Sequence, residues 1–297
     1  MSQKYFDPEG LSRIGNMELV ARQVVEGFLT GRHRSPYHGF SVESLDHRSY
    51  NPGDDPRMID WKVLARTDKY HVKLFEDETN LRAHILLDCS RSMNYASDKK
   101  YLTKLAYGSY LAAALTYLML RQNDAVGLVL FDAEVREYLP PKARPAQFRR
   151  ILDLLDHTMA HEDTDVGKVL HAIAERIPRR GLVIVISDLI DEEAGIASGL
   201  QHFRHDNHEV VVFHVMDDAE LTFPFDRVTR FKDMEGFGKL TANPAQLRAR
   251  YLARMQQFQE NLKALCFERK VSYELACTKE PYDHLLAAYL EKRSRIG

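Results

Sequence analysis

Four short runs of branched apolar residues constrain most strongly what this chain can fold into. They are rich in Val, Ile and Leu and span 83–88, 126–131, 182–187 and 210–215. Runs of this length and composition are typical of strands that are buried on both faces of a parallel sheet. Helical patterns separate them, over 101–120, 145–158, 165–177 and 192–204. This alternation predicts an α/β fold with a doubly wound, mostly parallel sheet.

Further elements are expected around these four strands. A polar strand over 135–139 should form a hairpin with the run that ends at Phe131, because only a few residues lie between them. In the last third, Pro244 is suited to open a long helix that reaches Glu268. A final strand over 271–277 and a closing helix over 282–293 follow. Residues 219–243 are expected to form an insertion rich in hairpins.

The first 80 residues have a different texture. A helical pattern over 10–29 leads into a polar stretch with turn residues and two short strand patterns, over 40–45 and 72–76. We therefore expect two domains. Residues 1–80 would form a small module with an N-terminal helix and short strands, and residues 81–297 the α/β domain with its insertion near 219–243.

Composition narrows the class of protein. Lys and Arg number 41 against 43 Asp and Glu, and this balance argues against a dedicated nucleic-acid binder. No apolar run approaches the roughly 18 residues of a membrane-spanning helix. The first residues lack the apolar stretch of a signal peptide, and three cysteines are an odd number for a disulfide framework. We expect a cytoplasmic protein with reduced thiols and no membrane span.

Side-chain oxygens follow the ends of two predicted strands. Asp88 ends one strand, and Ser90 and Ser92 come next at alternate positions, while Asp188 directly follows another strand. Thr164 lies on a loop that enters a helix. Functional crevices of open α/β sheets lie beyond the carboxyl ends of strands, so we expect these groups to converge. Two carboxylates and three hydroxyls favour Mg²⁺, with Mn²⁺ or Ca²⁺ as alternatives, over Zn²⁺.

Several readings of this oxygen set remain open. A cation held there would need water or an outside ligand, and a partner's acidic side chain would turn it into a bridge between two proteins. A Mg²⁺-dependent hydrolase or phosphotransferase is the alternative, with His161 as the nearest candidate base. A third reading is a vestigial site that binds partners without metal. The structural reading makes Asp88 and Asp188 helix caps, with the serines binding turn amides.

Two motifs resemble known families. The pattern Asp88-x-Ser90-x-Ser92, with Thr164 and Asp188, resembles the metal-ion-dependent adhesion site of von Willebrand factor type A domains. Upstream, Tyr50-Asn-Pro-Gly-Asp-Asp-Pro-Arg-Met-Ile-Asp-Trp61, followed by Ala65-Arg66, resembles the signature of a bacterial family called domain of unknown function 58. In that family the signature precedes a type A-like domain, which is Rossmann-like in architecture.

The resemblance carries functional expectations. It implies a non-enzymatic protein that is either cytosolic or tethered to a membrane. Genes of the family commonly accompany MoxR-type AAA+ ATPases. The expected partner is therefore such an ATPase or its client, and the expected role is that of an adaptor in assembly or maturation of protein complexes.

The upstream signature gathers charged side chains around the only tryptophan. Its members are Asp54, Asp55, Arg57, Asp60, Trp61 and Arg66. Because Arg forms bidentate pairs with carboxylates, a network of these residues would lock the loop onto the sheet domain. A partner-docking surface and direct catalysis are the alternative readings.

Three histidines recur at every third position, at His202, His205 and His208. They span a predicted helix end and the following turn, so they are not expected to share one face. We therefore predict a solvated surface and no metal cluster there.

Overall fold

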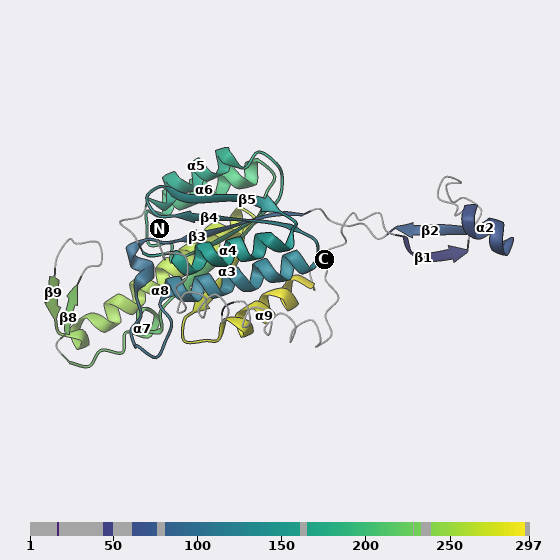
Figure 1. The fold of residues 1–297 in the computed structure, drawn as a ribbon. Helices are drawn as coiled ribbons and strands as arrows, with labels where there is room; N and C mark the ends of the chain where they lie inside the picture. Colours follow the sequence, from purple (N-terminus) through teal and green to yellow (C-terminus); the bar gives the residue numbers. More distant parts are fainter. Residues whose placement is uncertain are drawn as a thin grey trace, which may run out of the picture.

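A six-stranded sheet organises the larger part of the chain (Figure 1). The computed structural model describes residues 17, 44–49, 61–75, 81–160, 165–227, 229–232 and 239–294. The strands of this sheet are β3 (Arg82–Asp88), β4 (Ala125–Phe131), β5 (Val135–Lys142), β6 (Leu182–Ser187), β7 (Glu209–Met216) and β10 (Ser272–Cys277). Their spatial order is β10-β7-β6-β3-β4-β5, and β5 alone runs antiparallel to its neighbour. The predicted α/β class and the hairpin of β4 with β5 are confirmed.

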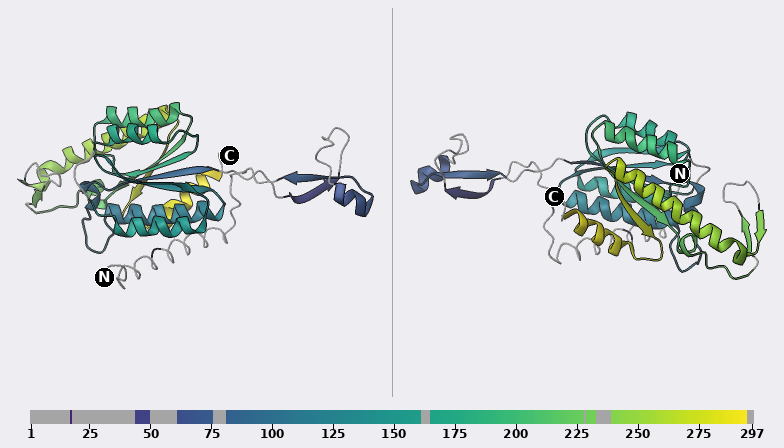
Figure 2. Two further views of the ribbon diagram at one scale, coloured as in Figure 1. Left: turned by 45° about the horizontal axis from the view of Figure 1, so that its top comes forward. Right: turned by 180° about the vertical axis from the view of Figure 1, so that it is seen from behind.

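Helices cover both faces of this sheet (Figure 2). One layer contains α3 (Lys104–Arg121), α4 (Pro145–His157) and α9 (Tyr282–Ser294). The other contains α5 (Val166–Arg176), α6 (Glu193–His205) and α8 (Pro244–Glu268). Successive side chains of a strand point to opposite faces, so Ile85 and Leu87 join the core under the first layer and Leu86 the core under the second. Burial on both faces explains why the strands have continuous apolar sequences.

Some boundaries differ from those predicted. Helix α3 begins at Lys104 and not near Tyr101, because Thr103 caps it by accepting a hydrogen bond from the Ala106 amide at 3.1 Å. A short 3₁₀ helix, η2 (Arg91–Asn94), precedes it.

The region between β7 and α8 also contains an element that the sequence reading missed. It is the short helix α7 (Asp218–Thr222). It is followed by an antiparallel pair, β8 (Thr229–Lys232) and β9 (Lys239–Ala242), which lies within the expected insertion.

The N-terminal region contains elements that belong to none of the layers described above. Strands β1 (Ser44–Ser49) and β2 (His71–Phe75) pair antiparallel in a two-stranded sheet of their own (Figure 1). Helix α2 (Trp61–Thr67) lies between them in sequence, where only turns and strands were expected. The helix predicted over 10–29 lies outside the described residues except for Met17, which is helical and buried.

The direction of chain progression reverses at β3. From β3 the chain passes through α3 to β4 on one side, and it later returns through α5 to β6 on the other side. The carboxyl ends of β3 and β6 therefore flank the switch point of the sheet, where open α/β folds place their ligands. Asp88 is the last residue of β3 and Ser187 the last of β6, so the topology alone brings their neighbourhoods together.

Helices α5 and α6 approach each other closely at two glycines. A Cβ atom on Gly167 would lie 2.7 Å from the backbone C and Cα atoms of Gly195, whereas a Cβ atom on Gly195 would lie 3.5 Å from the Gly167 Cα. We expect Gly167→Ala to lower the free energy of unfolding by about 1–3 kcal/mol through overpacking. Gly195→Ala makes only ordinary contacts and serves as the matched control. Urea unfolding compares the two, and equal effects would contradict this account of the packing.

Candidate metal-binding site

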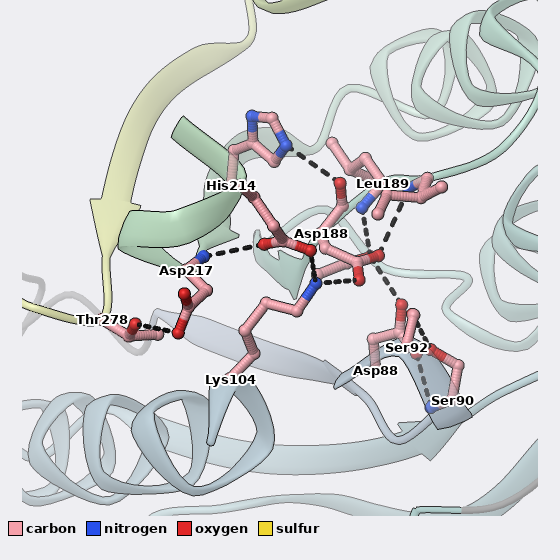
Figure 3. Close-up of polar contacts among 12 residues, drawn as sticks. Asp88, Ser90, Ser92, Lys104, Asp188, Leu189, His214, Asp217 and Thr278 are labelled. Atoms are coloured by element: carbon pink, nitrogen blue, oxygen red, sulfur yellow. Dashed lines mark hydrogen bonds and ion pairs between the residues drawn. The ribbon is translucent and has the colours of Figure 1, made fainter. Parts of the chain in front are cut away.

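Asp88 forms the centre of a cluster of side-chain oxygens at the end of β3 (Figure 3). It is fully buried. Its Oδ1 accepts a hydrogen bond from the Ser90 amide at 2.8 Å, and its Oδ2 accepts one from the Ser187 hydroxyl at 2.6 Å. The hydroxyl oxygens of Ser90 and Ser92 are 3.0 Å apart. The structure thus brings three of the predicted site residues together.

Asp188 joins this cluster from the end of β6. Its side chain is 3% exposed, and its Oδ2 lies 2.8 Å from the Lys104 Nζ. Its Oδ1 accepts a long hydrogen bond of 3.3 Å from the Ile190 amide. The pKa of Asp88 is raised to about 7, first by burial and then by the negative charge of Asp188, against the effect of the hydrogen bonds from Ser187 and Ser90. The two carboxylates therefore repel each other in a place from which water is largely excluded.

Other predicted site residues are not all placed. Thr164 and the candidate base His161 lie outside the described residues, as do Asp54, Asp55, Arg57 and Asp60. Trp61 and Arg66 lie on α2, where Trp61 is 61% exposed. The proposed network of Arg and Asp side chains around Trp61 remains a prediction.

Lys104 is the functional candidate that the sequence reading missed. It is fully buried in the first turn of α3, and its Nζ lies 2.8 Å from the Asp188 Oδ2 (Figure 3). The same Nζ lies 2.8 Å from the Glu220 Oε1. Burial by itself would lower the pKa of the ammonium group, but the two carboxylates outweigh burial and the pKa is raised. A signal was available in the sequence, because Lys104 shares helical spacing with buried Leu111 and Leu115 and so belongs to an apolar stripe.

His214, on β7, contacts the backbone carbonyl of Asp188. It is fully buried, and burial lowers its pKa to about 4, so the ring is neutral near pH 7. Its Nε2 lies 2.9 Å from the Asp188 carbonyl and its Nδ1 lies 2.7 Å from the Tyr273 hydroxyl. A neutral ring matches both contacts when Nε2–H donates to the carbonyl and Nδ1 accepts from the hydroxyl. The peptide of Asp188 is thereby tied to β7 and β10.

Cys89 lies inside the motif but faces away from its oxygens. Its buried thiol donates a hydrogen bond to the Phe131 carbonyl at 3.1 Å. Burial, followed by the negative charges of Asp132 and Asp88, raises the pKa of the thiol to about 12. The thiol is therefore protonated in the metal-free protein at neutral pH.

The three regularly spaced histidines do not form a cluster, but one of them was placed wrongly. His208 is fully buried, and its Nε2 lies 3.1 Å from the Ile177 carbonyl. His202 packs against His171, with 2.9 Å between their Nδ1 atoms, and His205 is exposed. His208 lies beyond the end of α6 and begins the return to the sheet, which explains why the turn carries it inward.

The chemistry of the gathered groups fits a hard divalent cation. Asp88, Ser90, Ser92 and Asp188 offer only oxygen, which Mg²⁺ prefers, and two buried carboxylates favour a positive charge between them. In the described part of the chain, no three His, Cys, Asp or Glu side chains are grouped as a ligand set. A cation at this site would therefore depend on serine hydroxyls and on further ligands from water or a partner.

Comparison with known proteins gives relatives that share much of the chain. The family described as protein of unknown function DUF58 matches residues 46–261. Uncharacterized proteins of Mycobacterium tuberculosis and Mycobacterium bovis are each 26% identical over 223 residues, which cover 73% of this chain and 68% of theirs. Both the upstream signature and the oxygen cluster lie within the matched family region.

Solved structures show more distant similarity. BatB from Bacteroides thetaiotaomicron has a TM-score of 0.46 at 16% identity and covers 73% of this chain and 100% of that chain. The SpRpn10 VWA domain has a TM-score of 0.39 at 13% identity and covers 73% of this chain and 96% of that domain. Among the helices of the described residues, none is both long and apolar enough to cross a membrane.

Proposed function

The chain belongs to the family of proteins of unknown function DUF58, and we propose that it is a non-enzymatic adaptor that binds a protein partner through a divalent cation. One observation carries this proposal. Side-chain oxygens from Asp88, Ser90, Ser92 and Asp188 gather at the carboxyl ends of β3 and β6, where the chain reverses direction across the sheet. That is where open α/β folds bind ligands.

The residues have distinct roles in this proposal. Asp88, Ser90 and Ser92 hold the cation from the end of β3, and Asp188 contributes the second negative charge from the end of β6. Thr164 is proposed as a further hydroxyl ligand. Mg²⁺ is the proposed ion, with Mn²⁺ or Ca²⁺ as alternatives. The bound ion supplies positive charge that a carboxylate of the partner can bind.

The proposed partner is a MoxR-type AAA+ ATPase or its client, acting in assembly or maturation of protein complexes. Support for it comes from the family resemblance, because genes of this family commonly accompany such ATPases. The same proposal places the protein in the cytoplasm.

A capture experiment tests the role of the cation. The immobilised protein is incubated with a purified MoxR-type ATPase from the same organism, in Mg²⁺ and in chelator, and the retained ATPase is quantified. The ATPase is used without nucleotide, so that the chelator does not act by removing Mg²⁺ from ATP. We expect retention in Mg²⁺ to fall at least about tenfold in chelator and in Asp88→Ala, which loses the central carboxylate.

Asp98→Ala is the matched control, because Asp98 is an exposed carboxylate on the loop after η2 and pairs with Lys100. It should retain the ATPase as the wild type does. Equal retention in Mg²⁺, in chelator and by Asp88→Ala would remove the cation from the mechanism. Phosphoester turnover by the purified protein that is lost in Asp88→Ala would contradict the non-enzymatic assignment.

A further inference from the structure

We propose that Lys104 is a built-in counter-cation that competes with the divalent ion for Asp188 and thereby sets the affinity of the site. This inference rests on the proposed cation site and adds a residue to it. Lys104 is not a ligand, since an ammonium group carries no free electron pair. It acts on the ion through the carboxylate that both would share.

The geometry holds the charge of Lys104 beside Asp188. Its Nζ lies 2.8 Å from the Asp188 Oδ2 (Figure 3). The Nζ also lies 2.8 Å from the Glu220 Oε1, and the side chain has no exposed surface. A buried ammonium group that is held by two carboxylates cannot turn to solvent without leaving both of them unpaired. The positive charge therefore stays beside Asp188 whether or not a second cation arrives.

Close packing of α3 against the sheet determines how far the Lys104 ammonium group lies from the strands. Gly108 follows Lys104 by one helical turn, and a Cβ atom there would lie 2.8 Å from the Leu87 Cδ1 and 3.1 Å from the Ile186 Cγ2. The absence of a side chain at Gly108 lets α3 lie close to β3 and β6, the two strands that carry the site. Lys104 is thereby positioned to reach Asp188 from the helix side.

Glu220 shares the charge of Lys104 and so moderates the competition. It lies on α7, where its Oε2 accepts a hydrogen bond from the Asp217 amide at 2.8 Å and completes a capping box. When Glu220 is ionised, its negative charge offsets part of the positive charge of Lys104, so Lys104 repels a cation at Asp188 less strongly. A change in either partner of this ion pair should therefore alter the affinity for a divalent ion, and in opposite directions.

The two changes have opposite expected signs. Lys104→Met removes a positive charge next to the cation, so the affinity for Mn²⁺ should rise by about tenfold. Glu220→Gln keeps the side-chain shape and an oxygen for the Asp217 amide but leaves the Lys104 charge unbalanced. The affinity for Mn²⁺ should then fall severalfold. A purely structural role of Lys104 would weaken binding in both variants, because both would loosen the site.

The test measures binding of Mn²⁺ alone, from the electron paramagnetic resonance signal of the free ion, to the full-length wild type and each variant at one neutral pH. Lys279→Met is the matched control, since Lys279 forms an exposed ion pair with Asp218, which lies on α7 together with Glu220. Its affinity should equal that of the wild type. Circular dichroism checks folding, and Glu220→Gln tests the inference even where Lys104→Met does not fold.

The outcomes separate this inference from the proposed function. Tighter binding by Lys104→Met together with weaker binding by Glu220→Gln supports it, and so does Mn²⁺ binding that is detectable only in Lys104→Met. If the wild type binds Mn²⁺ and Lys104→Met binds it equally or more weakly, the inference is overturned. The same holds if Glu220→Gln binds Mn²⁺ as tightly as the wild type or more tightly. Either result leaves the proposed cation site intact. Absence of Mn²⁺ binding from all folded proteins overturns the proposed site and the inference with it.

Discussion

Replacing Lys104 with methionine is expected to lower the free energy of unfolding by about 3–5 kcal/mol. The substitution removes the ammonium group but leaves Asp188 and Glu220, whose side chains are 3% and 17% exposed. Removal of one partner from a buried ion pair is costly because the remaining charge has lost both water and its partner. Urea unfolding in chelator measures the loss without any contribution from bound metal.

Lys279→Met provides the comparison on the surface of the same region. Lys279, whose side chain is 52% exposed, pairs with Asp218. Exposed ion pairs of this kind contribute about 0–1 kcal/mol to the free energy of unfolding. A similar loss of stability in both variants would show that burial around Lys104 is not what makes its ion pair important.

Asp88→Asn is expected to stabilise the metal-free protein, by up to about 4 kcal/mol at about pH 8. The pKa of Asp88 is about 7 in the folded chain against an ordinary value of 3.8. Between these values the native state binds more protons than the unfolded state, so the free energy of unfolding falls as pH rises and stays low above pH 7. Asparagine cannot ionise, and its amide can still bond to Ser90 and Ser187.

The comparison between variant and wild type isolates this effect. His84 and His214 have pKa values lowered to about 4 by burial, and their stability effect has the opposite sign, since they favour the folded chain as pH rises. Urea unfolding in chelator at a series of pH values should therefore give a difference between Asp88→Asn and wild type that grows from about pH 4 to about pH 7. A difference that does not depend on pH would refute the assignment of the raised pKa to Asp88.

Much of the fold could be predicted from the sequence because the apolar runs reflect the burial of the strands. The runs at 83–88 and 182–187 are mostly apolar on both faces, with His84, Asp88 and Ser187 as the polar exceptions, and this pattern is typical of a strand covered on both faces. Asp88 and Asp188 could be placed near each other from topology alone, since parallel strands end at one edge of a sheet. Neither required knowledge of side-chain contacts.

Contacts between distant segments could not be predicted in this way. Lys104 and Glu220 are far apart in sequence, and no spacing rule joins a helix start to a short capped helix beyond β7. The same limit applies to His208, which lies in a polar turn but packs inward against the Ile177 carbonyl. In each case a polar residue is buried by partners that only the tertiary structure supplies.

The orientation of one thiol has a consequence for which metals the crevice can distinguish. Soft ions such as Cu⁺ prefer sulfur ligands, and Cys89 lies between Asp88 and Ser90 in the sequence. In the metal-free protein this thiol is protonated, and its hydrogen bond points to the Phe131 carbonyl on β4. The proposed site therefore presents no preformed thiolate to a soft ion, and we expect it to favour hard ions such as Mg²⁺ over Cu⁺.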